Sequence, residues 1–372
     1  MMNSSLFQIP EKLKKIQEKI LSFREREQLY LQNGDSGYGK SPSNIAFIKY
    51  WGKEENLFQI PQNSSLSFIL NHFFSETKVT VQGVFLPKDT KIKKIFNHSF
   101  NLTGNKNNIL ENKVTEKMQT WLENILHPFA DEIALNIETQ NNFPTACGIA
   151  SSASGYAALT MAIANLLQLS TKLNKDEFQY WCYEWARLGS GSATRSIVFS
   201  EEDKFVEWEK LNNETITKQI HAHENWGKLK HCVLILNEDK KTISSSDGHK
   251  LAKSSLFHQI RVNNIEYKLS LLKKALLNFN FDVVKDLTEE DALLMHSVMH
   301  TGNPSLKYLN QASAKIISAF IQERNSKSIK AFWTLDAGPN IHILYMSGQE
   351  PFLTKIFQNI SEICEFEILG NF

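Results

Sequence analysis

The stretch FPTACGIASSASG, residues 143–155, leads without a break into YAALTMAIANLL, an apolar segment of helical length. Its proline, glycines and small side chains let the backbone approach an anion closely. A helix that begins here presents unpaired N–H groups and the positive end of its dipole to that anion. The pattern predicts a phosphate-binding helix start. The alternative is a small-residue helix start that packs tightly on a sheet and binds no ligand.

A second glycine-containing stretch, GDSGYGKS at residues 34–41, matches the phosphate-loop pattern G-x-x-x-x-G-K-[ST]. A working phosphate loop follows a buried strand and opens a helix. Here the upstream segment FREREQLYLQN is charged and helical in its period, whereas Pro42 and the strand-like SNIAFIKYW follow downstream. Because this order is the reverse of what the chemistry requires, we interpret residues 34–41 as a solvated connecting loop.

The charge balance of the chain argues against a strong attraction to nucleic acid or anionic membranes. Of 372 residues, 41 are Lys or Arg and 40 are Asp or Glu, which gives a formal net charge of +1. The longest apolar run, YAALTMAIANLLQL, is too short to span a bilayer, and the first residues show no cationic segment followed by a long apolar one. We therefore expect a cytoplasmic protein with no nucleic-acid or membrane partner.

Different patterns of apolar residues divide the chain. Residues 11–32 carry apolar side chains every three or four positions amid charge, which predicts an amphipathic helix within an N-terminal extension, residues 1–40. Strand-like runs then dominate to about residue 140, and a helical stretch follows. Later in the chain, strand-like and helical runs alternate. The whole pattern predicts a mixed α+β fold with two domains, residues 41–220 and 221–372.

Two further stretches carry polar side chains suited to an anionic substrate. RLGSGSATRS, residues 187–196, places several hydroxyls and Arg195 in a glycine-containing loop, and a guanidinium can meet a diphosphate or carboxylate with two parallel hydrogen bonds. In LDAGPN, residues 335–340, Asp336 follows an apolar run and precedes a turn, where catalytic carboxylates often lie. Taken alone, the first stretch is equally typical of a polar loop, and Asp336 of a turn residue.

Five segments, in order along the chain, resemble the mevalonate diphosphate decarboxylases, a family of the GHMP kinase superfamily. They are NIAFIKYWGK (44–53), FPTACGIASSASG, RLGSGSATRS, KTISSSDG (241–248) and LDAGPN. The resemblance implies a two-domain GHMP kinase fold, with an N-terminal domain like the second domain of ribosomal protein S5 and a ferredoxin-like C-terminal domain. It also implies an ATP site between the domains and a homodimer.

The resemblance implies ATP-dependent decarboxylation of (R)-5-diphosphomevalonate to isopentenyl diphosphate, with ADP, phosphate and carbon dioxide as further products. The C3 hydroxyl is a poor leaving group until ATP phosphorylates it. By position, Asp336 matches the catalytic aspartate that meets this hydroxyl, Lys49 matches the lysine beside it, and Arg195 matches the arginine that orients the substrate carboxylate. Mg2+ is expected with ATP, held chiefly by phosphates rather than by a protein metal site.

Matching positions also imply the binding residues. The substrate is expected to contact Asn44, Tyr50, Trp51, Lys53, Ser190, Ser192, Arg195, Ser245 and Ser246. The ATP site is expected to include Pro144, Gly148, Ala150, Ser151, Ser152 and Ser154. The chain departs from the family pattern at His249, where the family usually has methionine.

Alternatives remain open. Related enzymes on the same scaffold phosphorylate mevalonate at C3 or decarboxylate the 5-monophosphate. The presence of both Lys49 and Asp336 favours full decarboxylation, since the relatives that only phosphorylate lack that pair. A phosphate-loop hydrolase is a different class, and it would depend on Lys40. A non-catalytic binding protein on this scaffold would be expected to lack Lys49 or Asp336.

Overall fold

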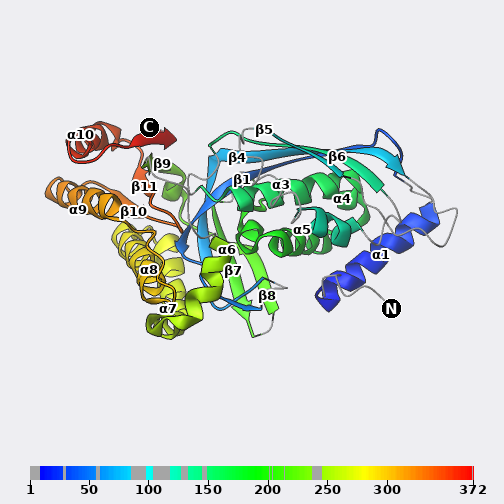
Figure 1. The fold of residues 1–372 in the computed structure, drawn as a ribbon, viewed down its shortest axis with the longest axis horizontal. Helices are drawn as coiled ribbons and strands as arrows, with labels where there is room; N and C mark the ends of the chain where they lie inside the picture. The colour runs from blue at the N-terminus through cyan, green and yellow to red at the C-terminus, as the bar shows by residue number, and fades with distance from the viewer. Residues whose placement is uncertain are drawn as a thin grey trace.

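The computed structural model describes residues 9–27, 31–55, 59–84, 98–103, 118–126, 133–144, 149–200, 202, 204–212, 214–236, 245–370 and 372. In its first part, a six-stranded sheet has the order β5-β6-β4-β7-β8, with β1 paired to β4 (Figure 1). The elements of this part are α1 (Glu11–Glu27), β1 (Ser36–Ile48), β2 (Lys53–Glu55), β3 (Ile60–Pro61), β4 (Ser65–Val84), β5 (His98–Thr103), β6 (Ile133–Asn141), α3 (Ser151–Leu166), α4 (Leu169–Lys172), α5 (Lys175–Gly189), the 3-10 helix η1 (Gly191–Ser196), β7 (Phe205–Leu211) and β8 (Glu214–Gln219).

Strand β1 carries the chain from the surface into the interior. It pairs antiparallel with β4 from Ser36 opposite Thr80 to Ile48 opposite Leu66, with a register shift after Pro42. Exposed and buried residues alternate over its first half, and every residue of its second half is buried. A strand covered on both faces is expected to be continuously apolar, as residues 45–48, IAFI, are. The residue after β1, Lys49, therefore lies in the interior.

Helix α3 covers the sheet along β1, and two glycines permit the close approach. A Cβ atom on Gly37 would lie 2.1 Å from the Ala162 carbonyl oxygen, and one on Gly39 would lie 2.0 Å from that of Ala158. The interpretation of residues 34–41 as a connecting loop is therefore wrong for residues 36–41, which form the start of β1. Glycine weakens a strand in general, but here it lets a helix backbone pack directly on it.

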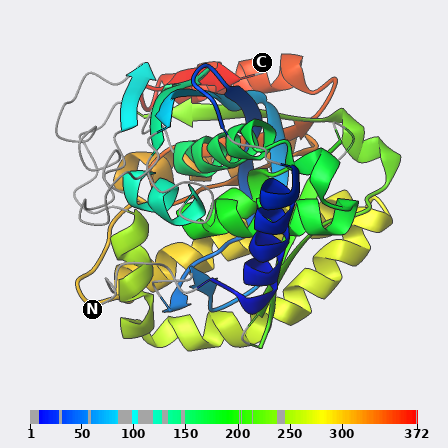
Figure 2. The same ribbon diagram turned by 90° about the vertical axis from the view of Figure 1, so that its right-hand side faces the viewer.

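The predicted N-terminal amphipathic helix is confirmed by α1. Its apolar side chains Leu13, Ile16 and Ile20 are buried in the core that α3 and α5 share. The Lys19 amine also forms an ion pair with Glu177 of α5, with 2.7 Å between Nζ and Oε2. Figure 2 shows α1 at the front of the molecule, and Figure 1 shows it at the opposite end from α9 and α10.

The second part of the molecule contains a four-stranded sheet in the order β10-β11-β9-β12, with antiparallel pairing throughout. Figure 1 shows helices α7 to α10 stacked at this end. The elements are the 3-10 helix η2 (Glu224–Lys228), β9 (Leu229–Ile235), α6 (Ser245–Leu251), the 3-10 helix η3 (Ala252–Ser254), α7 (Leu256–Leu277), α8 (Phe281–Thr301), α9 (Gln311–Ser326), β10 (Ala331–Thr334), β11 (Ile341–Met346), α10 (Glu350–Ser361) and β12 (Glu367–Gly370).

An aromatic cluster joins the two sheets. The ring of Phe47 on β1 meets Phe332 on β10 edge to face, with 5.4 Å between centroids. Phe47 also contacts Phe205 of β7 at 5.8 Å, and Phe332 contacts Phe281 of α8 at 5.6 Å. Such offset and edge-to-face pairs add to the stabilisation from apolar burial. The ends of β1 and β10 are thereby held next to each other. Lys49 and Asp336, two of the three predicted catalytic residues, follow these ends.

The arrangement confirms the predicted mixed α+β fold. Strand β8 ends at Gln219 and β9 begins at Leu229, on either side of the proposed domain boundary at 220/221, while the domain division itself stays a prediction. Among the residues that the structure describes, no helix is both long enough and apolar enough to cross a membrane.

Candidate active site

An open pocket lies where the ends of β1 and β10 meet the start of α3. Its empty space, including the open mouth, amounts to about 800 Å³. The wall combines cations, a carboxylate, hydroxyls and aromatic rings. The lining residues are Ala46, Lys49, Tyr50, Trp51, Ile149, Ala150, Ser151, Ser152, Ser192, Arg195, His249, Met295, Asp336 and Ala337.

Lys49 and Asp336 form an ion pair in this pocket. The distance between Lys49 Nζ and Asp336 Oδ1 is 2.8 Å, and the side chains are 2% and 29% exposed. Burial by itself would raise the pKa of Asp336. The opposing effects, of which the positive charge of Lys49 is the largest, outweigh burial, so the pKa of Asp336 lies below its ordinary value. Burial lowers the pKa of Lys49, and Asp336 partly offsets this effect. The carboxylate is therefore ionised at neutral pH and is accessible from the pocket, where it can accept a proton or a hydrogen bond.

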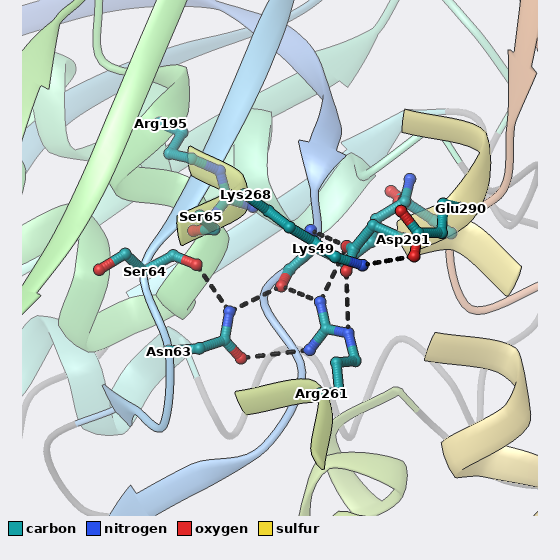
Figure 3. Close-up of polar contacts among 10 residues, drawn as sticks. Lys49, Asn63, Ser64, Ser65, Arg195, Arg261, Lys268, Glu290 and Asp291 are labelled. Carbon is teal, nitrogen blue, oxygen red and sulfur yellow. Dashed lines mark hydrogen bonds and ion pairs between the residues drawn. The ribbon is translucent and has the colours of Figure 1, made fainter. Parts of the chain in front are cut away.

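The backbone of Lys49 is fixed by a buried polar network (Figure 3). The Lys49 N–H donates to Asp291 Oδ2 at 2.7 Å, and the Lys49 carbonyl accepts from Arg261 Nη2 at 2.7 Å and from Asn63 Nδ2 at 2.9 Å. Arg261 also donates two hydrogen bonds to Asp291, at 2.9 and 3.1 Å. Asp291 of α8 and Arg261 of α7 thus bind the two peptide groups that flank the Cα atom of Lys49.

This network was not predicted from the sequence. Arg261 and Asp291 are almost fully buried, although each stands in a helix whose exposed positions carry many charges. A signal existed in principle: opposite charges on the apolar faces of two consecutive helices indicate a buried pair. Their shared target, Lys49, lies more than 200 positions away in the sequence, so only the tertiary structure identifies it.

Arg195 lies in η1 and is held against β4. Its Nε donates to Ser67 Oγ at 2.7 Å, and its Nη1 donates to Ser65 Oγ. Its guanidinium carbon lies 5.9 Å from the ring centroid of Trp208. Burial lowers the pKa of Arg195 to about 10, which leaves the group charged at neutral pH. The site therefore contains a positioned cation whose hydrogen bonds, within the described part of the chain, go only to hydroxyls.

Tyr50 and Trp51 form an aromatic wall beside the ion pair. The Tyr50 hydroxyl and the Trp51 indole N–H are buried, and neither has a hydrogen-bond partner among the residues that the structure describes. Buried polar groups in proteins are nearly always paired, so an orphaned donor facing a pocket indicates a ligand. Burial raises the pKa of Tyr50, which keeps its hydroxyl protonated.

The start of α3 faces the same pocket through Ala150, Ser151 and Ser152. Ala150 adopts the left-handed conformation, with φ at 47°, and no side chain of the described residues caps the helix. The first N–H groups of a helix have no intrahelical acceptor, so an uncapped start leaves them available to an anion. The Ser152 and Ser190 hydroxyl oxygens lie 3.5 Å apart, which brings α3 close to the end of α5.

The structure corrects the predicted loop at residues 187–196. Its first part completes α5, and its second part is η1. Two glycines serve packing: a Cβ on Gly189 would lie 2.2 Å from the Tyr156 ring, and one on Gly191 would lie 2.8 Å from the Tyr50 ring. Close packing of aromatic rings on the backbone, rather than loop freedom, explains these glycines.

Several predicted site residues lie outside the pocket lining, and their roles remain predictions. Asn44 is buried, and its Nδ2 donates to Ser196 Oγ at 2.8 Å. Ser154 is buried, with its Oγ 2.7 Å from Ser75 Oγ. Ser190 lies between α5 and η1, Lys53 begins β2, and Pro144 is exposed after β6.

Three predicted residues cannot be compared in the same way. Gly148 lies outside the residues that the structure describes. Ser245 and Ser246 begin α6, but their side chains also lie outside the described part. Among the described residues, no group of three or more His, Cys, Asp or Glu side chains is placed to hold a metal ion.

Comparison with known proteins identifies the family. Residues 41–219 match the diphosphomevalonate decarboxylase-like N-terminal domain, and residues 231–367 match the mevalonate 5-diphosphate decarboxylase C-terminal domain. The chain is 31% identical over 341 residues to the diphosphomevalonate decarboxylase of Candida albicans, covering 87% of this chain and 88% of the relative.

Solved structures show the same fold. The mevalonate diphosphate decarboxylase of Staphylococcus aureus has a TM-score of 0.73 at 29% identity and covers 91% of this chain and 96% of its own. That of Enterococcus faecalis has a TM-score of 0.71 at 30% identity, with 90% and 99% covered. A further structure, with a TM-score of 0.73 at 29% identity and 90% and 99% covered, is a complex with MVAPP, AMPPCP and magnesium. These likenesses confirm the predicted GHMP kinase fold, and the chain belongs to the diphosphomevalonate decarboxylase family.

Proposed function

We propose that this protein decarboxylates (R)-5-diphosphomevalonate at the expense of ATP, giving isopentenyl diphosphate, ADP, phosphate and carbon dioxide. The observation that carries the proposal is the Lys49–Asp336 ion pair, 2.8 Å apart, in a pocket shared with Arg195 and the start of α3. This constellation supplies a base, two cations and a phosphate site in one place. Membership of the decarboxylase family supports the same reaction.

Asp336 and Lys49 serve the phosphorylation step. The Asp336 carboxylate accepts the proton of the C3 hydroxyl as its oxygen bonds to the γ-phosphorus of ATP and ADP leaves. Lys49 keeps this carboxylate ionised and stabilises negative charge on the transferred phosphoryl group. Because Lys49 is held through its backbone, its amine remains positioned when Asp336 takes up the proton.

Decarboxylation then follows from the departure of the phosphate. The C3–O bond breaks with its electrons going to the phosphate, and the electrons of the C1–C2 bond form the C2–C3 double bond as carbon dioxide leaves. Arg195 binds the C1 carboxylate before this step. Within the described residues its guanidinium donates hydrogen bonds only to the hydroxyls of Ser67 and Ser65, and a guanidinium binds a carboxylate more strongly than it binds a neutral hydroxyl. The pocket also limits access of water to the developing positive charge at C3.

ATP and Mg2+ are the expected co-substrate and metal, as the complex of the related structure with AMPPCP and magnesium suggests. The donors fit ATP, because the Ser151 and Ser152 hydroxyls and the free N–H groups of α3 suit phosphate oxygens. The same hydroxyls and the ATP phosphates would hold Mg2+, which neutralises phosphate charge when bound. Proposed additional contacts are Pro144, Gly148, Ala150 and Ser154 for ATP, and Asn44, Tyr50, Trp51, Lys53, Ser190, Ser192, Ser245 and Ser246 for the substrate.

The remaining proposals concern organisation and location. We propose an N-terminal extension of residues 1–40, a nucleotide-binding domain of residues 41–220 and a C-terminal domain of residues 221–372. The family resemblance implies a homodimer, and the charge balance and short apolar runs of the sequence predict a cytoplasmic location. Sedimentation of the purified protein tests the dimer, and a single species at the monomer mass of 42.6 kDa would contradict it.

Product analysis tests the reaction. The purified protein is incubated with ATP, Mg2+ and, in parallel, mevalonate, its 5-phosphate and its 5-diphosphate, each labelled at C1. The proposal predicts labelled carbon dioxide in step with ADP from the 5-diphosphate alone. ADP without carbon dioxide would identify a 3-kinase, and carbon dioxide from the monophosphate would change the substrate. ADP formation that is independent of any mevalonate compound would contradict the proposal.

A further inference from the structure

His249 is an imidazole in the pocket wall that the proposed reaction does not use. It lies on α6 and lines the same pocket as Lys49 and Arg195. Its ring centroid is 4.3 Å from that of Tyr50 and 4.5 Å from that of Trp51. The His249 ring therefore packs against Tyr50 and Trp51, whose buried donors have no hydrogen-bond partner among the described residues.

A backbone hydrogen bond fixes which nitrogen of His249 carries the proton. The Gly52 N–H donates to His249 Nδ1, with 3.0 Å between the nitrogens. An acceptor nitrogen carries no hydrogen, so the neutral ring has its hydrogen on Nε2. The donor itself is fixed, because Gly52 has φ at 95° and a Cβ there would lie 2.3 Å from Gln62 Oε1.

The surroundings keep this ring neutral. Burial lowers the pKa of His249 well below its ordinary value, and the nearby charges of Lys53, Arg195 and Arg261 lower it further. The residue thus has one occupied acceptor, Nδ1, and one N–H donor, Nε2. No acceptor for Nε2 lies among the residues that the structure describes, so the donor is available to a molecule in the pocket.

We propose that His249 binds an oxyanion of the substrate through Nε2–H, as a neutral hydrogen-bond donor whose tautomer is set by the Gly52 N–H. The proposal rests on the proposed function, which supplies a substrate with a diphosphate at one end and a carboxylate at the other. Tyr50 contributes a second uncharged donor next to His249. Together they recognise an oxyanion in a pocket that already contains two cations.

Two substitutions separate the binding role from the packing role. In His249→Asn, the amide oxygen lies near the position of Nδ1 and can still accept from Gly52, but the Nε2–H is lost. In His249→Gln, the longer side chain brings an amide N–H near the position of Nε2, but the acceptor for Gly52 is lost. If His249 only fixes Gly52, Gln is the more damaging change. If it binds the substrate, Asn is the more damaging change.

The measurement is the Kd of 5-diphosphomevalonate by titration calorimetry, with inorganic diphosphate and mevalonate as the other ligands and the melting temperature of each variant as a folding control. For His249→Asn we expect binding of 5-diphosphomevalonate roughly tenfold to a hundredfold weaker, and for His249→Gln a smaller loss. A parallel loss with inorganic diphosphate places the contact at the phosphate end, and a loss with mevalonate places it at the carboxylate.

Either of two results overturns the proposal: an Asn variant that binds as tightly as the unsubstituted protein, or a Gln variant that binds as weakly as the Asn variant. If the unsubstituted protein neither binds nor decarboxylates 5-diphosphomevalonate, the proposed function fails and the role of His249 fails with it. If it does both and His249→Asn changes nothing, only the role of His249 fails.

Discussion

Two glycine-containing segments of this chain, residues 34–41 and 143–155, both have the composition of a phosphate-binding loop, yet they occupy different places in the fold. The first segment enters β1 and pairs with β4 on the sheet. The second segment leads into the uncapped start of α3, where Ser151 and Ser152 line the pocket. Only the second has the helix N-terminus that a phosphate site requires.

The comparison teaches that the flanking elements, rather than the letters of a motif, decide whether glycines serve a ligand or the fold. In the first segment Gly37 and Gly39 lie against carbonyl oxygens of α3, so their missing side chains permit packing. The two segments are also connected through the structure. Strand β1 packs against α3, whose first turn faces the pocket. The residue after β1, Lys49, lines the same pocket.

The largest expected effect is on catalysis at the pocket. Asp336→Asn removes the acceptor for the C3 hydroxyl proton, so kcat should fall roughly 10²- to 10⁴-fold. The start of α3 is unchanged in this variant, and nucleotide binding should persist. Steady-state kinetics and the Kd of AMPPCP with Mg2+ measure the two effects. A variant with kcat within threefold of the unsubstituted protein would show that Asp336 is not the base.

The network behind Lys49 should have a large effect on both stability and rate. Asp291→Asn leaves Arg261 as a buried cation without its carboxylate, which should lower the free energy of unfolding by about 3–5 kcal/mol and lower kcat through Lys49. Chemical denaturation and kcat measure these effects. Glu290→Gln is the matched control, since the Glu290 side chain, which pairs with Lys268, is 55% exposed and the pair should contribute about 0–1 kcal/mol. Equal effects in the two variants would contradict the positioning role.

One glycine from each segment sharpens the comparison further. Gly39→Ala forces a Cβ against the Ala158 carbonyl, and overpacking of this kind should destabilise the protein by about 1–3 kcal/mol. Gly155 lies in α3 with no atom within 4 Å of an added Cβ, so Gly155→Ala should be neutral or stabilise the protein by up to about 1 kcal/mol. Thermal unfolding measures both. Opposite signs are expected, and a stabilising Gly39→Ala would refute the packing argument.

The smallest expected effect is at the lysine of the phosphate-loop pattern. Lys40 points to the surface, where its amine lies 3.6 Å from Glu76 Oε1 and 3.6 Å from the Phe74 ring centroid. Exposed ion pairs and cation–π contacts contribute about 0–1 kcal/mol. Lys40→Ala should therefore leave kcat and the Kd of AMPPCP unchanged within about twofold and reduce stability by no more than this amount. Loss of nucleotide binding in this variant would restore the phosphate-loop interpretation.

Local pattern predicted much of the secondary structure. The strand-like runs predicted before about residue 140 contain β4 and β6, and the helical stretch predicted after them contains α3 and α5. The start of β1 was missed because glycine and proline are unfavourable in most strands. Here the backbone of α3 packs directly on the strand, and only glycine leaves room for it. The 3-10 helix η1 was missed because its glycine, Gly191, indicates a loop until the Tyr50 ring is placed against it.

The site divides in the same way. The family resemblance assigned Lys49, Arg195 and Asp336 to one active site. The structure places all three around one pocket. Asn63, Arg261 and Asp291 were not predicted, because they act on the backbone of Lys49 and carry no motif of their own. The hydrogen bond from the Gly52 N–H to His249 was missed for the same reason, since every residue type except proline has a backbone N–H and the sequence does not show which one is used.

The most direct test of the central claim is a crystal structure of this protein with AMPPCP, Mg2+ and 5-diphosphomevalonate. The account predicts the terminal phosphates of the nucleotide at Ser151 and Ser152 on the start of α3, next to Lys49, with the C3 hydroxyl of 5-diphosphomevalonate within hydrogen-bonding distance of Asp336. Residues 34–41 should remain in strand β1 without contact to the nucleotide. Phosphates bound at residues 34–41, with the pocket at Asp336 empty, would contradict it.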